Sequence, residues 1–213
     1  MLYFDKNALQ QLGKVKRLNL VNSITGIKPA NLIGTVSPQG KTNLAIFSSV
    51  VHLGSNPALI GMVVRPGGEV RRHTYENIKA TGCYTINHVH PPLVQAAHYT
   101  SAKFAEGESE FTACEFTESY RDGFLAPYVM ESSICFGLQL VEELPVKVNG
   151  TLLLIGEVQH LYLPPAVLAE NGYLDLSATG SVGISGLNTY YQVQKIGSLP
   201  YARPGQRPQF ETE

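Results

Sequence analysis

The sequence predicts a mainly β protein with short helices, closed into a barrel. Short apolar runs bounded by turn residues recur along most of the 213-residue chain, as expected for strands. Helical stretches are few and short. One run, Ala58–Val64, is apolar almost throughout, which is typical of a strand buried on both faces. Many strands with few helices favour a closed barrel that carries helical insertions.

The strand pattern is clearest in the first third of the chain. Asn31–Val36 is apolar and ends at the tetrapeptide SPQG, whose residues favour a tight reversal. Thr42–Val51 is expected to be the next strand, with Ser48 and Ser49 directly after its apolar run. Small polar residues beside a buried strand let a flat ligand approach the backbone, so this layout predicts a ligand laid along one strand.

Shorter elements are expected along the rest of the chain. Glu69–Ala80 predicts a short helix that stops at Gly82. Leu93–Tyr99 predicts a helical turn, because the two prolines before it are tolerated at a helix start. The remaining expected elements are strands Cys83–Asn87, Ser132–Glu142 and Gly150–Tyr162, a helix or turn over Ala166–Asn171, and the ambiguous segment Phe111–Thr117.

The chain is expected to form one domain over residues 1–198, because it shows no internal repeat and no convincing linker. Residues 199–213 are rich in Pro, Gly, Gln and Arg, which predicts an extended or disordered tail. Hydrophobic residues make up 44% of the chain and charged residues 15%, as in folded globular proteins. The low charge density suggests that a partner subunit covers part of the surface.

Charge and cysteine content exclude several classes of protein. The net charge of −1 argues against a nucleic-acid partner, since phosphate neutralisation requires clustered Lys and Arg. Cys83, Cys114 and Cys135 lie far apart, which predicts reduced thiols in a cytoplasmic setting. The N-terminus lacks the apolar core of a secretion signal, and no run approaches the roughly 20 apolar residues that span a bilayer. A soluble protein with no membrane partner is therefore expected.

The first candidate site lies on the second predicted strand. Asn43, Phe47, Ser48 and Ser49 offer amides and hydroxyls that can bond the polar edge of a flat heterocycle. The alternative is an ordinary strand whose serines face solvent. Taken alone, the four residues fit that alternative better, because a suggestive layout does not establish a site.

The second candidate site is a basic loop at the start of the predicted helix. Arg65, Arg71, Arg72, His73 and Thr74 place cationic and hydroxyl groups there, and a helix N-terminus beside a guanidinium is suited to phosphate. A solvated basic face is the alternative. The loop lacks the spacing of a P-loop and of a G-x-G-x-x-G motif, so neither ATP nor a Rossmann dinucleotide is indicated.

The third candidate site follows the predicted helical turn. Thr100, Ser101, Ala102 and Lys103 combine two hydroxyls, a small residue and an amine, which suit an anionic or flat ligand. An exposed loop with an ordinary lysine explains the same residues equally well.

No metal site and no familiar catalytic motif is expected. His88 and His90 lie on one strand face in a regular strand, but the sequence places no third ligand near them. The chain contains neither G-x-S-x-G nor H-E-x-x-H. Catalytic residues therefore stay unassigned.

Six segments together carry a resemblance to a known family. Between Leu20 and Tyr191, the chain resembles the flavin reductase-like family, which includes the flavoredoxins and adopts an FMN-binding split β-barrel. The matching segments are TNLAIFSSV, NPALIGMVVRP, RHTYENIKATGCYTIN, HYTSAKF, TLLLIGEVQHLYL and SVGISGLNTYYQV. The resemblance lies in their order and spacing rather than in any single motif.

The resemblance implies a cofactor and a set of residues around it. Members bind FMN non-covalently and are usually homodimers with the flavin near the subunit interface. On this chain, the implied contacts are Asn43, Phe47, Ser48 and Ser49 along the isoalloxazine, Arg65, His73 and Thr74 at the phosphate, Thr100, Ser101, Ala102 and Lys103 closing the site, and Tyr190 from the C-terminal segment.

The implied activity is hydride transfer from NADH or NADPH to flavin or to a small acceptor. The flavin carries out the chemistry in such proteins, so no protein acid or base is required. Two alternatives stay open: a flavin-bearing electron carrier without direct NAD(P)H turnover, and a non-catalytic ligand-binding barrel.

Overall fold

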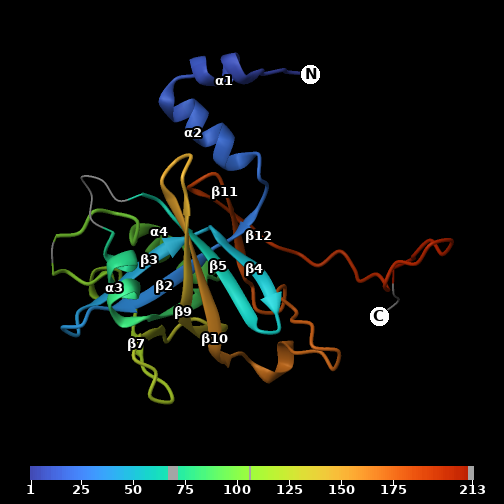
Figure 1. The fold of residues 1–213 in the computed structure, drawn as a ribbon. Coiled ribbons are helices and arrows are strands. Elements are labelled where there is room, and N and C mark those ends of the chain that lie inside the picture. The colour runs from blue at the N-terminus through green and yellow to red at the C-terminus, as the bar shows by residue number, and fades with distance from the viewer. Residues whose placement is uncertain (67–71, 106, 211–213) are drawn as a thin grey trace.

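Seven antiparallel strands form one sheet that curls into a barrel left open along one seam (Figure 1). The computed structural model describes residues 1–66, 72–105 and 107–210. In sheet order the strands are β3 (Thr42–Phe47), β2 (Asn31–Val36), β6 (Cys83–His88), β9 (Cys135–Val146), β10 (Thr151–Tyr162), β5 (Ala58–Val64) and β4 (Val50–Ser55).

The seam lies between β3 and β4, which are consecutive in the chain but form opposite edges of the sheet. The prediction of one strand over Thr42–Val51 is wrong, because the chain bends at Ser48 and leaves β3. Ser49 then joins the other edge. Its carbonyl accepts from Val63 N at 3.1 Å, and its hydroxyl donates to Val63 O at 2.7 Å. The short link through Ser48 and Ser49 therefore connects the two edges of the seam, although no strand pairing among the described residues joins them.

Alternation along β2 divides the apolar residues between two cores. Ile33 faces the barrel interior, while Leu32 faces the outside. The inner core consists of Ile33, Met62, Val64, Ile78, Tyr84, Ile86, Leu138 and Leu154. Period-two alternation forces this division, since neighbouring strand residues point to opposite faces.

Helix α3 (His73–Thr81) closes one end of the barrel. Ile78 belongs to the inner core, and the Asn77 amide donates to Thr35 Oγ1 of β2 at 3.1 Å. Gly82 adopts the left-handed conformation with φ of 74° and ends the helix, as predicted. The predicted start at residue 69 falls partly on residues 69–71, outside the described residues, and Arg72 is not helical.

The outer core packs further elements against β2 and β3. Leu32 and Leu44 contact a cluster that includes Ala97 of α4, Phe111 of α5 and Ile184 of β11. The elements outside the barrel are α4 (Val94–Tyr99) with the 3₁₀ turn Pro91–Leu93, α5 (Glu110–Ala113), the pair β7 (Glu118–Ser119) and β8 (Tyr128–Val129), the 3₁₀ turn Pro165–Val167, and the sheet of β1 (Lys28–Pro29), β11 (Val182–Ser185) and β12 (Thr189–Gln192).

Tertiary pairing moved two predicted boundaries. The strand expected over Ser132–Glu142 is β9, which extends to Val146 because Val146 pairs with Thr151 of β10. The helix or turn expected over Ala166–Asn171 is a single 3₁₀ turn, and Leu168 pairs instead with Leu174.

Both ends of the chain extend away from the barrel (Figure 1). The N-terminal arm consists of α1 (Lys6–Gln11) and α2 (Lys14–Ser23), and neither helix contains a buried residue. The segment after β12 runs outward with little regular structure up to Phe210. Among the described residues, none of the helices is both long and apolar enough to cross a membrane.

A glycine on β2 tests the packing of the outer layer. A Cβ at Gly34 would lie 2.3 Å from Pro127 O and 2.5 Å from Thr85 Oγ1. Gly34→Ala is expected to lower the free energy of unfolding by about 1–3 kcal/mol, because a buried backbone segment must move. Guanidinium denaturation measures the loss.

Gly13→Ala is the matched control, because a Cβ there meets nothing within 4 Å. Its expected change is below about 1 kcal/mol, since it alters only an exposed helix cap. Equal destabilisation by the two variants would contradict the packing described for Gly34.

Candidate functional site

The outward edge of β3 is the backbone of the candidate site. Its N–H groups at Leu44 and Ile46 point away from β2, because both bond to side chains outside the sheet. Leu44 N donates to Glu110 Oε2 at 3.1 Å, and Ile46 N donates to Thr100 Oγ1 at 2.9 Å. Two side chains from distant segments therefore cover this edge where no strand does.

Ser48 offers the next backbone donor. It follows the end of β3, where the chain bends, and its N–H has no acceptor among the residues that the structure describes. Ser49 differs, because both its carbonyl and its hydroxyl bond to Val63. Phe47 packs its half-buried ring against the inner core. Of the candidate residues on this strand, Ser48 therefore keeps the free backbone donor.

Asn43 brings the edge of β3 to the start of α3. Its amide donates to Thr74 Oγ1 at 3.1 Å, and both residues are buried. Among the described residues, the hydroxyl of Thr74 donates to no partner, so its hydrogen can serve a ligand. The N-cap residue Arg72 makes no side-chain capping bond, and no described side chain caps the first-turn N–H groups that begin at His73. A helix start of this kind is suited to an anion.

The segment after α4 borders the same edge. Thr100 is buried and donates to Ala97 O at 2.7 Å while it accepts from β3. Ser101, Ala102 and Lys103 are exposed. Ser101 Oγ donates to His98 O at 2.7 Å, which keeps the turn closed. The structure therefore fixes Thr100 against β3 and leaves the next three residues open to solvent.

Tyr190 reaches this region from β12. Its ring packs edge-on against His98, with centroids 5.8 Å apart, and its hydroxyl lies 3.0 Å from His98 Nδ1. Burial raises the pKa of Tyr190, so the phenol stays neutral at physiological pH. Tyr190 thus contacts α4 at His98, two residues before Thr100.

Two cationic candidates make no contact with the rest of the site in the described part of the chain. Arg65 follows β5 and is exposed, and Lys103 is exposed in its turn. Arg72 and His73 lie at the start of α3. Arg71 lies outside the described residues. The structure therefore joins Asn43 to Thr74 and Thr100 to β3, and it leaves the long cations free to reach a ligand.

Sequence reasoning missed Glu110. Its side chain is only 9% exposed, and its carboxylate holds Leu44 N although 66 residues separate the two. The segment that follows it, Phe111–Thr117, is ambiguous in the sequence, and no local pattern indicates such a contact. The pairing follows only from the packing of α5 on β3.

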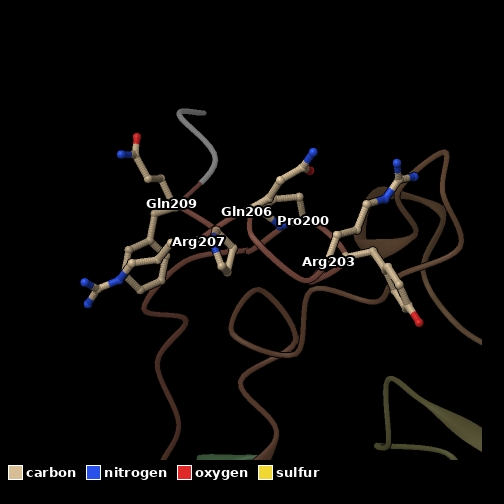
Figure 2. A pocket seen from close by; sticks show the side chains of 8 residues that line it. Pro200, Arg203, Gln206, Arg207 and Gln209 are labelled. Carbon is tan, nitrogen blue, oxygen red and sulfur yellow. The ribbon is translucent and has the colours of Figure 1, made fainter.

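The hollow at the C-terminal end is separate from this edge. Figure 2 shows that it is formed by the tail folding back on itself, with Arg203 and Arg207 projecting outward. Its lining residues all come from positions 200–210, and none belongs to β3 or α3. It is therefore not the candidate site.

The donors present are of two kinds. The N–H of Ser48 has no acceptor among the described residues, and a free backbone donor of this kind can bond a carbonyl. The start of α3 is tied to β3 through Asn43 and Thr74, and a helix start of this kind can hold a phosphate. Asn43 lies five residues before Ser48, up to about 17 Å along an extended strand, so the two kinds of donor lie at opposite ends of β3.

Comparisons with known proteins identify the family and the fold. A model of the flavin reductase like domain matches residues 27–179. A candidate flavin reductase with a split barrel domain from Shewanella frigidimarina NCIMB 400 is 45% identical, with a TM-score of 0.91 over 95% of this chain and 100% of that one. A comparison with curated proteins gave no match.

Two more distant structures share the fold. Nitrilotriacetate monooxygenase component B from Bacillus cereus is 20% identical, with a TM-score of 0.82 over 93% of this chain and 98% of that one. Flavoredoxin of Desulfovibrio vulgaris (Miyazaki F) is 22% identical, with a TM-score of 0.70 over 84% and 92%. The split-barrel fold expected from the sequence is confirmed, and the chain belongs to the flavin reductase-like family.

Proposed function

We propose that this chain binds FMN along the edge of β3 and the start of α3 and acts as an NAD(P)H-dependent flavin oxidoreductase. The observation that carries the proposal is the Asn43–Thr74 hydrogen bond, which ties the edge strand that ends before Ser48 to the start of α3. Family membership supports the flavin. A related fold described as an FMN-binding protein comes from Thermus thermophilus.

Each residue group has a defined task in this proposal. Bound FMN supplies the two-electron chemistry of hydride transfer. Ser48 orients the polar edge of the ring through its N–H, and Thr74 holds the phosphate with the first-turn N–H groups. Thr100 keeps β3 in place through Ile46 N. Lys103 and Arg65 add positive charge from the rim, which favours a phosphate and a reduced, anionic ring.

The two candidate functions differ in the source of the electrons. Direct reduction by NADH or NADPH makes the protein a reductase. A carrier would instead receive electrons from a partner protein, and the similar fold of a flavoredoxin motivates that second candidate. We favour the reductase, because the 45% identical structure is described as a candidate flavin reductase. Such a reaction takes place in the reduced, cytoplasmic setting expected from the sequence.

A homodimer is part of the proposal. Val51 and Leu53 of β4 are 48% and 42% exposed, and both flank the bare backbone of Gly61 on the outer face of the sheet. Leu144 of β9 is 42% exposed on the same face, opposite Leu153 of β10. Contiguous apolar surface of this kind marks an interaction site. A second copy of the chain is the occupant that we propose.

The exposed arms support the same occupant. Helix α2 presents Val15, Leu18 and Val21 without burying any of them. The Shewanella structure covers 95% of this chain, so most of both arms has a counterpart there. The barrel of a second copy can cover the apolar side chains of α2, which the barrel of the same chain leaves exposed.

The assignment of Arg65 to the phosphate is tested by removing the guanidinium of that residue. Arg65→Ala is expected to weaken FMN binding by about 1.5–3 kcal/mol, because a charge-assisted hydrogen bond is lost. Quenching of flavin fluorescence during titration measures the affinity. Arg203→Ala removes the same charge in the tail, from a hollow whose lining residues lie between positions 200 and 210, and is expected to leave affinity unchanged (Figure 2). Unchanged affinity in Arg65→Ala, or an equal loss in both variants, would refute the assignment.

The electron donor is identified by anaerobic mixing with each nicotinamide nucleotide. The FMN-loaded protein is expected to lose its absorbance near 450 nm within seconds after addition of NADH or NADPH, since bound flavin accepts the hydride directly (about 1–10³ turnovers per second is usual for enzymes). Stopped-flow absorbance follows the change. Unbleached flavin with both nucleotides would instead support the electron carrier.

The dimer is tested by light scattering after size exclusion. The expected mass is twice the 23.2 kDa of one chain. The double variant Val51→Asp and Leu53→Asp is expected to shift the protein towards the monomer, because two charges then enter an apolar interface. Val148→Asp is the control, since that side chain is 97% exposed on the β9–β10 hairpin. A monomeric wild-type protein would contradict the proposal.

A further inference from the structure

Glu110 is the one Asp, Glu, Lys or Arg side chain that is buried among the residues that the structure describes. It lies at the start of α5, packed on the outward edge of β3. A buried carboxylate is costly unless it is hydrogen-bonded. Here it accepts from Leu44 N and lies within bonding reach of its own backbone N–H.

The carboxylate lies beside the anion site. Leu44 directly follows Asn43, whose amide contacts Thr74 at the start of α3. Glu110 also interacts electrostatically with His73, the first residue of that helix. A negative charge next to a phosphate site repels the ligand that the site is built to hold.

In the described part of the chain, the titratable groups that interact electrostatically with Glu110 come from three segments. His73 faces it from α3, Glu108 from the loop before α5, and Cys114 from the end of α5. Glu118 belongs to an adjacent network, in which Thr42 Oγ1 donates to its carboxylate at 2.6 Å and lies 2.8 Å from Ser109 Oγ. His73 is the basic side chain among these groups.

We propose that Glu110 is a positioning residue that holds the edge of β3 and whose negative charge limits the affinity of the neighbouring site for the FMN phosphate. The inference rests on the proposed function and deepens it. The hydrogen bond to Leu44 fixes the strand that presents Ser48. The charge makes phosphate binding depend on pH.

The sign of the pH dependence follows from burial. Burial raises the pKa of Glu110 above the ordinary value of a glutamate. Above that pKa the ionised carboxylate opposes the phosphate. As pH falls through it, the carboxylate takes up a proton from solvent and the repulsion disappears. The Glu110 contribution to FMN affinity is therefore unfavourable at high pH and vanishes at low pH.

Two variants separate the hydrogen bond from the charge. Glu110→Gln keeps an oxygen that accepts from Leu44 N but removes the charge. Glu110→Ala removes both. Glu108→Gln is the matched control, because it removes the charge of an exposed neighbour on the same loop. Thermal unfolding of each variant confirms that it is folded before binding is measured.

The measurement is the dissociation constant of FMN and of riboflavin from about pH 4.5 to about pH 8.5. At the upper end, Glu110→Gln is expected to bind FMN about three- to tenfold more tightly than the wild type. The two affinities are expected to approach one another as pH falls through the pKa of Glu110. Riboflavin lacks the phosphate, so its affinity is expected to be the same in both proteins at every pH.

The outcomes distinguish the inference about Glu110 from the proposed FMN binding. Parallel FMN profiles in the wild type and Glu110→Gln overturn the inference about charge while FMN binding itself stands. An equal effect on riboflavin and FMN also overturns it. Weaker binding of both flavins by Glu110→Ala supports the role in holding β3. A wild-type protein that binds FMN at no pH overturns the proposed function together with this inference.

Discussion

The unpaired edge of strand β3 is the constraint on which the site depends. A barrel that is left open along a seam exposes backbone N–H groups, and such an edge invites pairing with other chains. Here the edge is covered by side chains from two separate segments. Glu110 binds the N–H of Leu44 and Thr100 binds that of Ile46. The first N–H beyond this cover, at Ser48, has no acceptor among the described residues.

A second constraint links the barrel to the helix that closes it. Thr35 and Asn43 are register partners on β2 and β3, and each bonds a residue of α3. Asn77 donates to Thr35, and Asn43 donates to Thr74. These buried amide–hydroxyl pairs have few alternative partners, so they fix how the helix lies on the strands. The start of α3 is thereby held next to the free edge of β3.

The two apolar cores explain why these polar pairs stay in register. The inner core fills the barrel, and the outer core packs α4, α5 and β11 against the same strands. Shifting β2 by one residue would exchange Ile33 and Leu32 between the cores. The positions of Thr35 and Gly34 on opposite faces follow from the same alternation. Packing therefore sets the register, and the register places the site.

The sequence by itself determined the strands with strong apolar runs, the stop at Gly82 and the family, because each depends on local pattern or on motif order. It also singled out Asn43, Thr74 and Thr100, which the structure places at one edge. Only the tertiary structure decided that the chain breaks at Ser48 and Ser49 to change sheet edges. Only it brought Glu110 to Leu44, across 66 residues. Contacts of that separation leave no trace in local periodicity, since they arise when the packing of distant elements brings a donor and an acceptor together.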